Sequence, residues 1–117
     1  MLSYNQVAEA IESEGRKIGT LAEEISSLAA NAAETEADYK IEIAKARMRL
    51  RDDAAATGTK VTVSEVDDAA TLQASESLRA HLLASGCLTA AREALRASQG
   101  RLDGLRTLAA GYRSAGG

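Results

Sequence analysis

The sequence predicts an all-α fold, namely a long antiparallel two-helix coiled-coil hairpin that can pair with a second copy into a four-helix bundle. The chain of 117 residues has no Pro, Phe or Trp and is rich in Ala, which favours helices and allows them to approach closely. Apolar side chains also recur at alternating spacings of three and four residues, as in the seam of a coiled coil. In the first half of the chain, this seam comprises Val7, Ile11, Ile18, Leu21, Ile25, Leu28, Ala32, Tyr39, Ile43, Ala46 and Leu50.

The first helix is expected to cover about residues 4–51. Ser3 or Asn5 can cap its start, because the side-chain oxygen of either residue can accept hydrogen bonds from free backbone N–H groups. Glu14 interrupts the apolar seam next to Gly15, so we expect the start of this helix to be its weakest part.

The second helix is expected over about residues 64–113. It begins with a capping-box pattern, formed either by Thr62 with Glu65 or by Ser64 with Asp67. Its apolar seam comprises Val66, Ala70, Ala74, Leu78, Leu82, Leu88, Ala91, Leu95, Ser98, Leu102, Leu105, Ala109 and Tyr112.

A turn over about residues 52–63 is expected to connect the two helices. This stretch lacks apolar periodicity and contains Gly58, which favours the end of a helix. Residues 114–117 are expected to form a flexible tail. Residues 1–117 would then make up a single helical-hairpin module.

The distribution of charge favours antiparallel packing of the two helices. Residues 1–39 are rich in Asp and Glu, whereas residues 79–117, which would face them in a hairpin folded at Gly58, are rich in Arg. Residues 40–51 are rich in Lys and Arg and would face the acidic stretch 52–78. A parallel homodimer would instead bring like charges together. A domain-swapped dimer would satisfy the same pattern as the hairpin.

Two pairs of glycines are spaced four residues apart, Gly15 with Gly19 and Gly100 with Gly104. Small residues at this spacing allow a second helix to come close. We therefore interpret both pairs as sites of close helix packing.

The sequence contains no pattern typical of an enzyme, a metal site or a cofactor site. Its only His and its only Cys, His81 and Cys87, are six residues apart and fall on different faces of a helix. They are therefore not expected to act as a catalytic pair. We expect His81 to lie on a polar edge and Cys87 to lie near the seam, with no catalytic residue, metal or cofactor.

Three features of the sequence predict a cytoplasmic protein without membrane contact. A single Cys fits a reducing compartment. No apolar run is long enough to cross a membrane. The first ten residues lack the basic start and apolar centre of a signal peptide.

Several apolar side chains fall outside both seams. Ile41, Ala44 and Met48 form a second stripe on the first helix, while Leu72 and Leu83 lie off the seam of the second helix. A two-helix hairpin would leave these side chains exposed, and a partner helix or a second copy would cover them. We therefore predict that Ile41, Met48, Leu72 and Leu83 bind a protein partner or mediate dimerisation.

Basic side chains concentrate near the expected turn, which suggests nucleic-acid binding as an alternative. The acidic stretch 65–76 would lie opposite these side chains and can neutralise them, and Tyr39 is the one nearby aromatic residue for base stacking. This alternative site comprises Lys45, Arg47, Arg49, Arg51 and Lys60.

The run Ile43–Leu50, the turn Ala56–Thr59 and above all the segment Leu102–Arg113 resemble a group of small Ala-rich helical proteins encoded by tailed bacteriophages, notably those of actinobacteria. The resemblance covers most of the chain and implies a phage accessory protein that acts in the host cytoplasm. Some members of this group are encoded among replication and recombination genes. The resemblance implies no catalytic residue.

These observations predict a non-catalytic phage coiled-coil interaction protein that binds a host or phage protein and self-associates. One alternative is a nucleic-acid-binding accessory factor in phage recombination or replication. Another alternative is a structural component of the virion.

Overall fold

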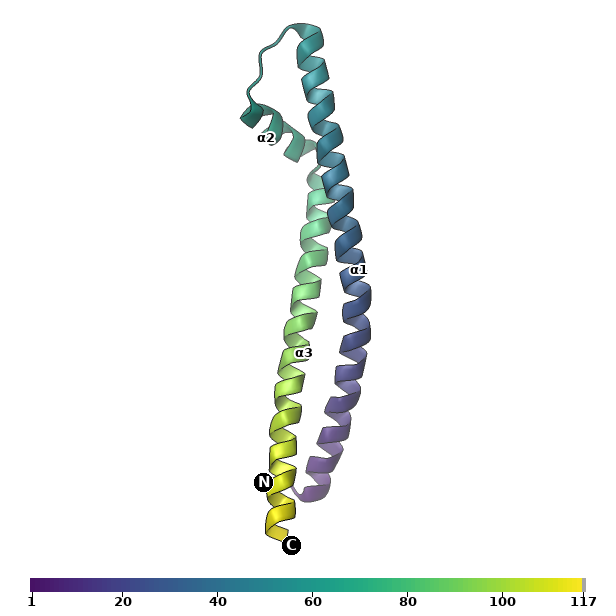
Figure 1. Cartoon of the computed structure of the whole chain (residues 1–117), viewed down its shortest axis with the longest axis vertical. Coiled ribbons are helices and arrows are strands. Elements are labelled where there is room, and N and C mark those ends of the chain that lie inside the picture. The colour runs from purple at the N-terminus through teal and green to yellow at the C-terminus, as the bar shows by residue number, and fades with distance from the viewer. Residues whose placement is uncertain (117) are drawn as a thin grey trace. The chain divides into compact units, whose positions relative to one another are not determined.

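The computed structural model is helical over nearly all of the residues that it describes, 1–116. It contains the helices α1 (Tyr4–Thr57), α2 (Val63–Gln73) and α3 (Ser75–Gly116), and this part of the chain has no strand (Figure 1). The prediction of an all-α fold is therefore confirmed. The chain divides into two units: a terminal unit of Met1–Ser27 with residues 88–116, and a central unit of Leu28–Cys87.

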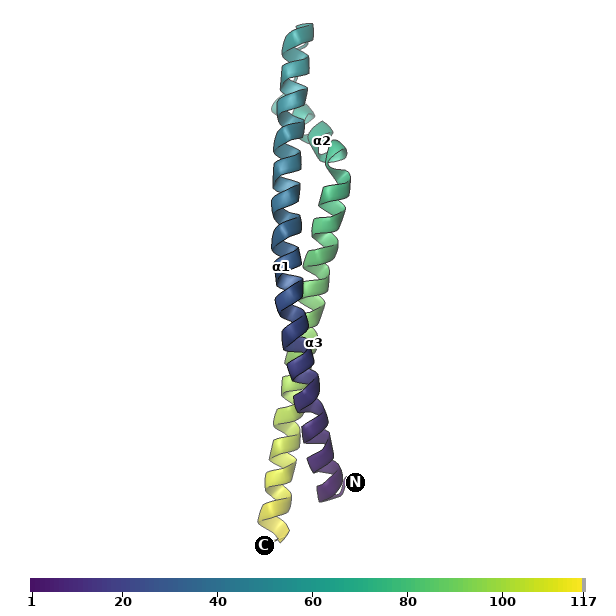
Figure 2. The same cartoon turned by 90° about the vertical axis from the view of Figure 1, so that its right-hand side faces the viewer.

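In the terminal unit, the start of α1 lies beside the end of α3 (Figures 1 and 2). The ring centroids of Tyr4 and Tyr112 are 6.3 Å apart in an edge-to-face arrangement, and the Tyr112 hydroxyl donates to the backbone carbonyl of Leu2. Val7 and Ser98 have no exposed surface. The packing between these two segments is thus anchored at the chain ends and continues inward along both helices.

The core of the central unit is small, because α1 packs there mainly against alanines. Ala46 of α1 and Ala70 of α2 are almost fully buried, which allows the two backbones to approach closely. The central cluster consists of Ile43, Ala46, Ala70 and Ala74, with Tyr39 and Leu50 partly buried against it. Ala54, Val66 and Ala84 are buried in the same unit.

A capping box begins α1 at Ser3. The Ser3 hydroxyl accepts a hydrogen bond from the Gln6 backbone N–H at 3.2 Å, and the Gln6 side-chain oxygen accepts one from the Ser3 backbone N–H at 2.8 Å. This reciprocal pair satisfies two backbone donors that the helix itself leaves free. Of the two predicted caps, the structure therefore uses Ser3 and not Asn5.

At its other end α1 continues six residues beyond the expected boundary and stops at Thr57. Gly58 adopts a positive φ of 69°, and the backbone N–H groups of Gly58 and Thr59 donate to the carbonyls of Ala55 and Ala54. These two bonds form a Schellman motif, which needs a residue in the left-handed region and therefore favours Gly. The Ala-rich stretch before Gly58 stays helical, because nothing ends it earlier.

The predicted second helix is divided at Ala74 into α2 and α3, which point in different directions (Figures 1 and 2). Thr62 caps α2 by accepting a hydrogen bond from the Glu65 backbone N–H at 3.1 Å. Ala74 has φ −93° and ψ 16°, but its N–H still donates to Ala70 and its carbonyl still accepts from Leu78. Ala74 thus keeps the i to i−4 spacing of helical hydrogen bonds on both sides of the bend.

One expected seam position of α3 does not face α1. Leu82, which was expected in the seam, is 60% exposed, and the prediction for this residue is wrong. His81 and Ala84 take the inward positions instead. The other predicted seam residues are buried or half-buried in both halves of the chain. Residues 114–116, expected as part of the tail, belong to α3, and Gly117 lies outside the described residues.

Candidate interaction surface

The four apolar residues predicted to bind a partner all lie in the central unit and are all exposed. The exposed fractions are 53% for Ile41, 63% for Met48, 76% for Leu72 and 63% for Leu83. Exposed apolar side chains that lie next to one another can mark a binding site, whereas single ones are common on protein surfaces. The exposure expected from the sequence is thus present.

These four residues do not form a single patch. Ile41 and Met48 are seven residues apart on α1, so they lie on one face, which points away from the buried Ile43. Leu83 lies on the face of α3 opposite to His81, whose ring stacks on Tyr39 of α1. The helix axes therefore separate Leu83 from Ile41 and Met48, and a partner would have to contact these two sites independently.

Leu83 belongs to a second, separate apolar site on α3. Together with Leu82 it borders a shallow groove of about 410 Å³. The remaining lining residues of this groove are Ser75, Leu78 and Arg79. Leu82 is therefore an exposed apolar residue that sequence reasoning missed, because its spacing from Leu78 matched the seam.

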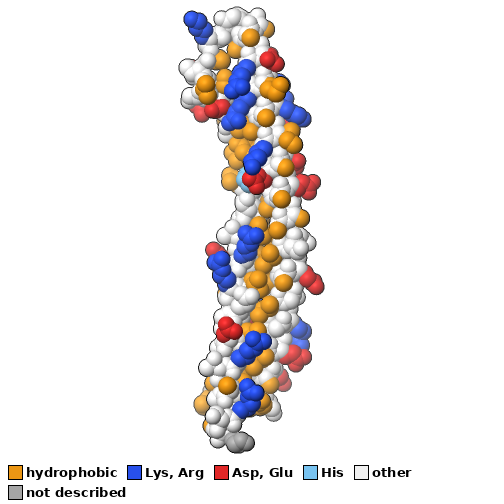
Figure 3. Space-filling view, in the orientation of Figure 1, with side chains coloured by type: hydrophobic (Ala, Val, Ile, Leu, Met, Phe, Trp, Pro, Cys, Tyr) orange, Lys and Arg blue, Asp and Glu red, His pale blue; other side chains and the backbone are white. Residues whose placement is uncertain are grey.

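The basic side chains of α1 lie along both edges of the face that carries Ile41 and Met48. At about 3.6 residues per turn, one edge carries Lys40, Arg47 and Arg51 and the other carries Lys45 and Arg49. The upper part of Figure 3 shows Lys and Arg side chains next to hydrophobic side chains over this part of α1. We call this surface the outer face of α1. It consists of Ile41, Ala44 and Met48, edged by Lys40, Lys45, Arg47, Arg49 and Arg51.

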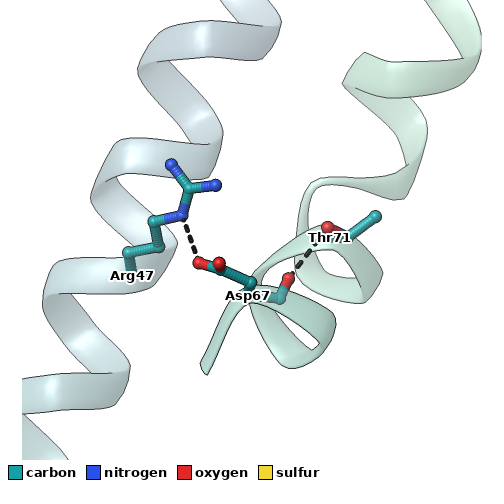
Figure 4. Close-up of polar contacts among 3 residues, drawn as sticks. All are labelled: Arg47, Asp67 and Thr71. Atoms are coloured by element: carbon teal, nitrogen blue, oxygen red, sulfur yellow. Dashed lines mark hydrogen bonds and ion pairs between the residues drawn. The ribbon is translucent and has the colours of Figure 1, made fainter. Parts of the chain in front are cut away.

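Two of these basic side chains are already paired with carboxylates. Arg47 Nε donates to Asp67 Oδ1 of α2 at 2.9 Å, and the backbone carbonyl of Asp67 accepts from the Thr71 hydroxyl (Figure 4). Lys40 Nζ lies 3.0 Å from Glu36 Oε1. The hydrogen bond and the charge of Lys40 lower the pKa of the Glu36 carboxyl from its usual value.

The other basic residues of the predicted nucleic-acid site keep their charges available. Within residues 1–116, no ion pair forms at Lys45, Arg49, Arg51 or Lys60, and all four are exposed. The expected neutralisation by the acidic stretch 65–76 is thus realised as an ion pair only at Asp67. Lys60 lies in the connection between α1 and α2 and so falls outside the outer face.

His81 differs from its expected position. Its ring is stacked on Tyr39 with centroids 6.0 Å apart, and its Nδ1 is buried without a hydrogen-bond partner. His81 is therefore a packing residue between helices and does not lie on a polar edge. Cys87 is exposed, directly before the half-buried seam residue Leu88. In the described part of the chain, no three His, Cys, Asp or Glu side chains gather as a metal site would require.

The glycine pairs do not mark close packing within the chain. A Cβ atom built at Gly15, Gly19, Gly100 or Gly104 would meet no atom within 4 Å. Within residues 1–116, these pairs are therefore not sites of close helix packing. The glycines lie on exposed surfaces, beside the seams and not in them.

Comparison of the chain with protein-family models, with curated proteins and with solved structures found no match. The resemblance to phage accessory proteins therefore stays a prediction. None of α1, α2 and α3 contains a stretch that is both long enough and apolar enough to cross a membrane.

Proposed function

We propose that the chain is a non-catalytic interaction protein that binds a protein partner through exposed apolar side chains of its central unit. The observation that carries this proposal is the exposure of Ile41 and Met48 on one face of α1. Burial of such side chains against a partner removes apolar surface from water, which drives most protein association. We propose that this partner is a host or phage protein in the host cytoplasm.

The proposal also includes an antiparallel hairpin architecture for the whole chain. This proposal is supported by contacts within each unit. The further along α1 a residue lies, the earlier its contact partner lies in the part of the chain after Gly58, as expected for antiparallel helices. Such contacts connect Tyr4 with Tyr112, Glu14 with Arg101, Tyr39 with His81, and Arg47 with Asp67.

Self-association is assigned to α3 in this proposal. The groove beside Leu82 and Leu83 is apolar and includes one charged residue, Arg79. Two copies can therefore meet there around a two-fold axis without facing rows of like charge. The outer face of α1 is less suited to such contact, because its edges are basic on both sides.

The experiment separates the two surfaces. Ile41→Glu with Met48→Glu is expected to abolish partner capture without changing the oligomeric mass of the chain. Leu82→Glu with Leu83→Glu is expected to reduce the mass, measured by light scattering, to that of one chain. Leu108→Glu, an exposed apolar residue of the terminal unit, is the matched control and should change neither property. Partner capture that is unaffected by Ile41→Glu with Met48→Glu would exclude the proposal.

Nucleic-acid binding is the second candidate function. It is favoured by Lys45, Arg49, Arg51 and Lys60, which form no ion pair with residues 1–116. Binding of single- or double-stranded DNA, measured by fluorescence anisotropy, should then weaken steeply as the salt concentration rises. Reversing the charges of Lys45, Arg49 and Arg51 should remove the binding and its salt dependence. Absence of binding at low salt would exclude this candidate.

A further inference from the structure

We infer that the partner of the outer face of α1 is an acidic amphipathic helix of another protein, whose apolar stripe covers Ile41 and Met48 while its carboxylates face the basic edges. The inference rests on the proposed function for the location of binding. It goes further by naming the chemistry of the partner.

The outer face has the shape of a single apolar stripe. Ile41, Ala44 and Met48 succeed one another at spacings of three and four, so their side chains form one stripe along the helix. Ile41 and Met48 are both more than half exposed, and Ala44 between them is also exposed. A continuous apolar stripe of two helical turns matches the stripe that an amphipathic helix presents to its partner.

Both edges of this stripe carry positive charge. Lys45 and Arg49 on one side and Arg51 on the other have no ion pair within the part of the chain that the structure describes. Glu42 is the one acidic residue between Lys40 and Arg51. Charges that flank an apolar seam select the partner, and basic flanks select acidic ones.

A second copy of this chain does not fit the same face. Two outer faces related by a two-fold axis would place one row of Lys and Arg against another row of the same sign. The acidic part of α1, residues 1–39, could supply carboxylates, but its apolar seam is directed at other parts of the chain. The acidic helix is therefore assigned to a different protein.

Nucleic acids and membranes match the outer face less well than a protein helix does. Bases stack on aromatic rings, but Tyr39 is already stacked on His81, and phosphates would leave Ile41 and Met48 uncovered. Helices that bind a membrane surface commonly insert Trp, Phe or Leu, whereas the outer face presents two large apolar side chains and no aromatic ring. An acidic protein helix accounts for both the apolar stripe and the basic edges.

The experiment titrates the full chain with three fluorescent 21-residue helical peptides and measures anisotropy. The first carries a Leu stripe with Glu on both flanks, the second carries Lys in place of every Glu, and the third has the composition of the first in scrambled order. We expect the first peptide to bind, and the second and third to bind at least tenfold more weakly. Equal binding of the Glu-flanked and Lys-flanked peptides, or no binding of the Glu-flanked peptide, would overturn the inference.

A charge exchange provides the most specific test. Lys45→Glu with Arg49→Glu should weaken binding of the Glu-flanked peptide at least tenfold and should allow the Lys-flanked peptide to bind. The matched control is Arg92→Glu with Arg96→Glu, which reverses two exposed charges at the same spacing on α3 and should change neither affinity. An equal loss in this control would show that net charge alone is responsible and would refute the inference.

Two further probes test whether a membrane or a nucleic acid occupies the outer face in place of an acidic helix. Vesicles of phosphatidylcholine with phosphatidylserine, and a DNA oligonucleotide, are added in place of the peptides. Binding of either probe that depends on Lys45 and Arg49, without peptide binding, refutes the acidic helix as occupant. If peptide binding fails but Ile41→Glu with Met48→Glu still abolishes capture of a partner, the proposed function stands and the inferred partner class is wrong.

Discussion

Arg101 of α3 donates through Nε to Glu14 Oε1 of α1 at 3.0 Å and thereby joins the two helices of the terminal unit. A second nitrogen of the same guanidinium donates to the hydroxyl of Ser98, which is fully buried, at 3.1 Å. The Glu14 side chain is 15% exposed, and its second oxygen is buried without a hydrogen-bond partner. Glu14, Ser98 and Arg101 thus form a polar layer between the two helices of the terminal unit.

Acid is expected to destabilise the terminal unit through Glu14. The hydrogen bond from Arg101 lowers the pKa of the Glu14 carboxyl, burial opposes this effect, and Ser98 adds to the lowering. Because the pKa is lower in the folded state, the stabilisation is complete above 4.5, the ordinary value, and is lost as the pH falls through the folded-state pKa. Melting temperature measured against pH by circular dichroism should therefore decrease below this value.

Glu14→Gln should make that pH dependence less steep, since the group that titrates has been removed. Glu12→Gln, which removes an exposed carboxylate on the same helix, is the control and should leave the profile largely unchanged. Glu36 has a lowered pKa as well and is expected to retain part of the acid sensitivity in the Glu14→Gln variant. Identical profiles for Glu14→Gln and the parent chain would contradict the assignment.

Removing Arg101 alone should destabilise the fold more than removing both partners of the ion pair. Arg101→Met leaves the mostly buried Glu14 carboxylate without its cation, and such an unpaired charge is strongly destabilising. Glu14→Leu with Arg101→Met replaces both charges by apolar groups and is expected to recover at least half of the lost melting temperature. Additive effects of the two substitutions would show that the two side chains act independently.

Val7 is expected to contribute strongly to stability, although it lies only four positions into the helix. It has no exposed surface, so Val7→Ala should lower the free energy of unfolding by roughly 2 kcal/mol. The control is Val63→Ala, whose side chain is 71% exposed and whose effect should stay within about 0.5 kcal/mol. Urea denaturation followed by circular dichroism measures both values. Equal effects would show that the chain end is frayed in solution.

The same substitution at two glycines should have effects of opposite sign. Gly58 has a φ of 69°, so Gly58→Ala should lower the free energy of unfolding by roughly 1–2 kcal/mol. Gly100 is helical and a Cβ there meets nothing within 4 Å, so Gly100→Ala should raise it by up to about 1 kcal/mol. A loss of stability in Gly100→Ala would indicate that a partner approaches this glycine in solution.

The seam residues could be read from the sequence because helical periodicity depends on local spacing alone. Every apolar seam position predicted between Val7 and Leu50 is buried or half-buried. The failure at Leu82 follows from the spacing of the expected positions. Val66 to Leu82 succeed one another in steps of four residues, and each step turns about 40° past a full helical turn, so the stripe drifts around the helix. Leu78 is still half-buried, but at the next turn the inward position belongs to His81 and Leu82 is exposed.

The candidate surface was predicted only in part. Its individual residues could be recognised, because apolar and basic side chains outside a seam are visible in the pattern. The grouping on α1 follows from helical periodicity, which puts Lys45 and Arg49 along one edge of the stripe of Ile41 and Met48. The structure adds that these side chains are exposed, that Leu83 lies on another helix beside Leu82, and that Lys60 lies in the connection between α1 and α2. The predicted apolar site and the predicted basic site therefore overlap only on α1.

The sequence by itself determined the helical class and every predicted seam position except Leu82. For the caps it offered alternatives, Ser3 or Asn5 and Thr62 or Ser64, and it placed Gly58 within the expected turn. These features depend on the conformational preferences and hydrogen bonds of neighbouring residues. The tertiary structure decided the bend at Ala74, the stacking of His81 on Tyr39 and the pairing of Glu14 with Arg101. Those features depend on which side chains meet across two helices, and spacing within one helix does not contain that information.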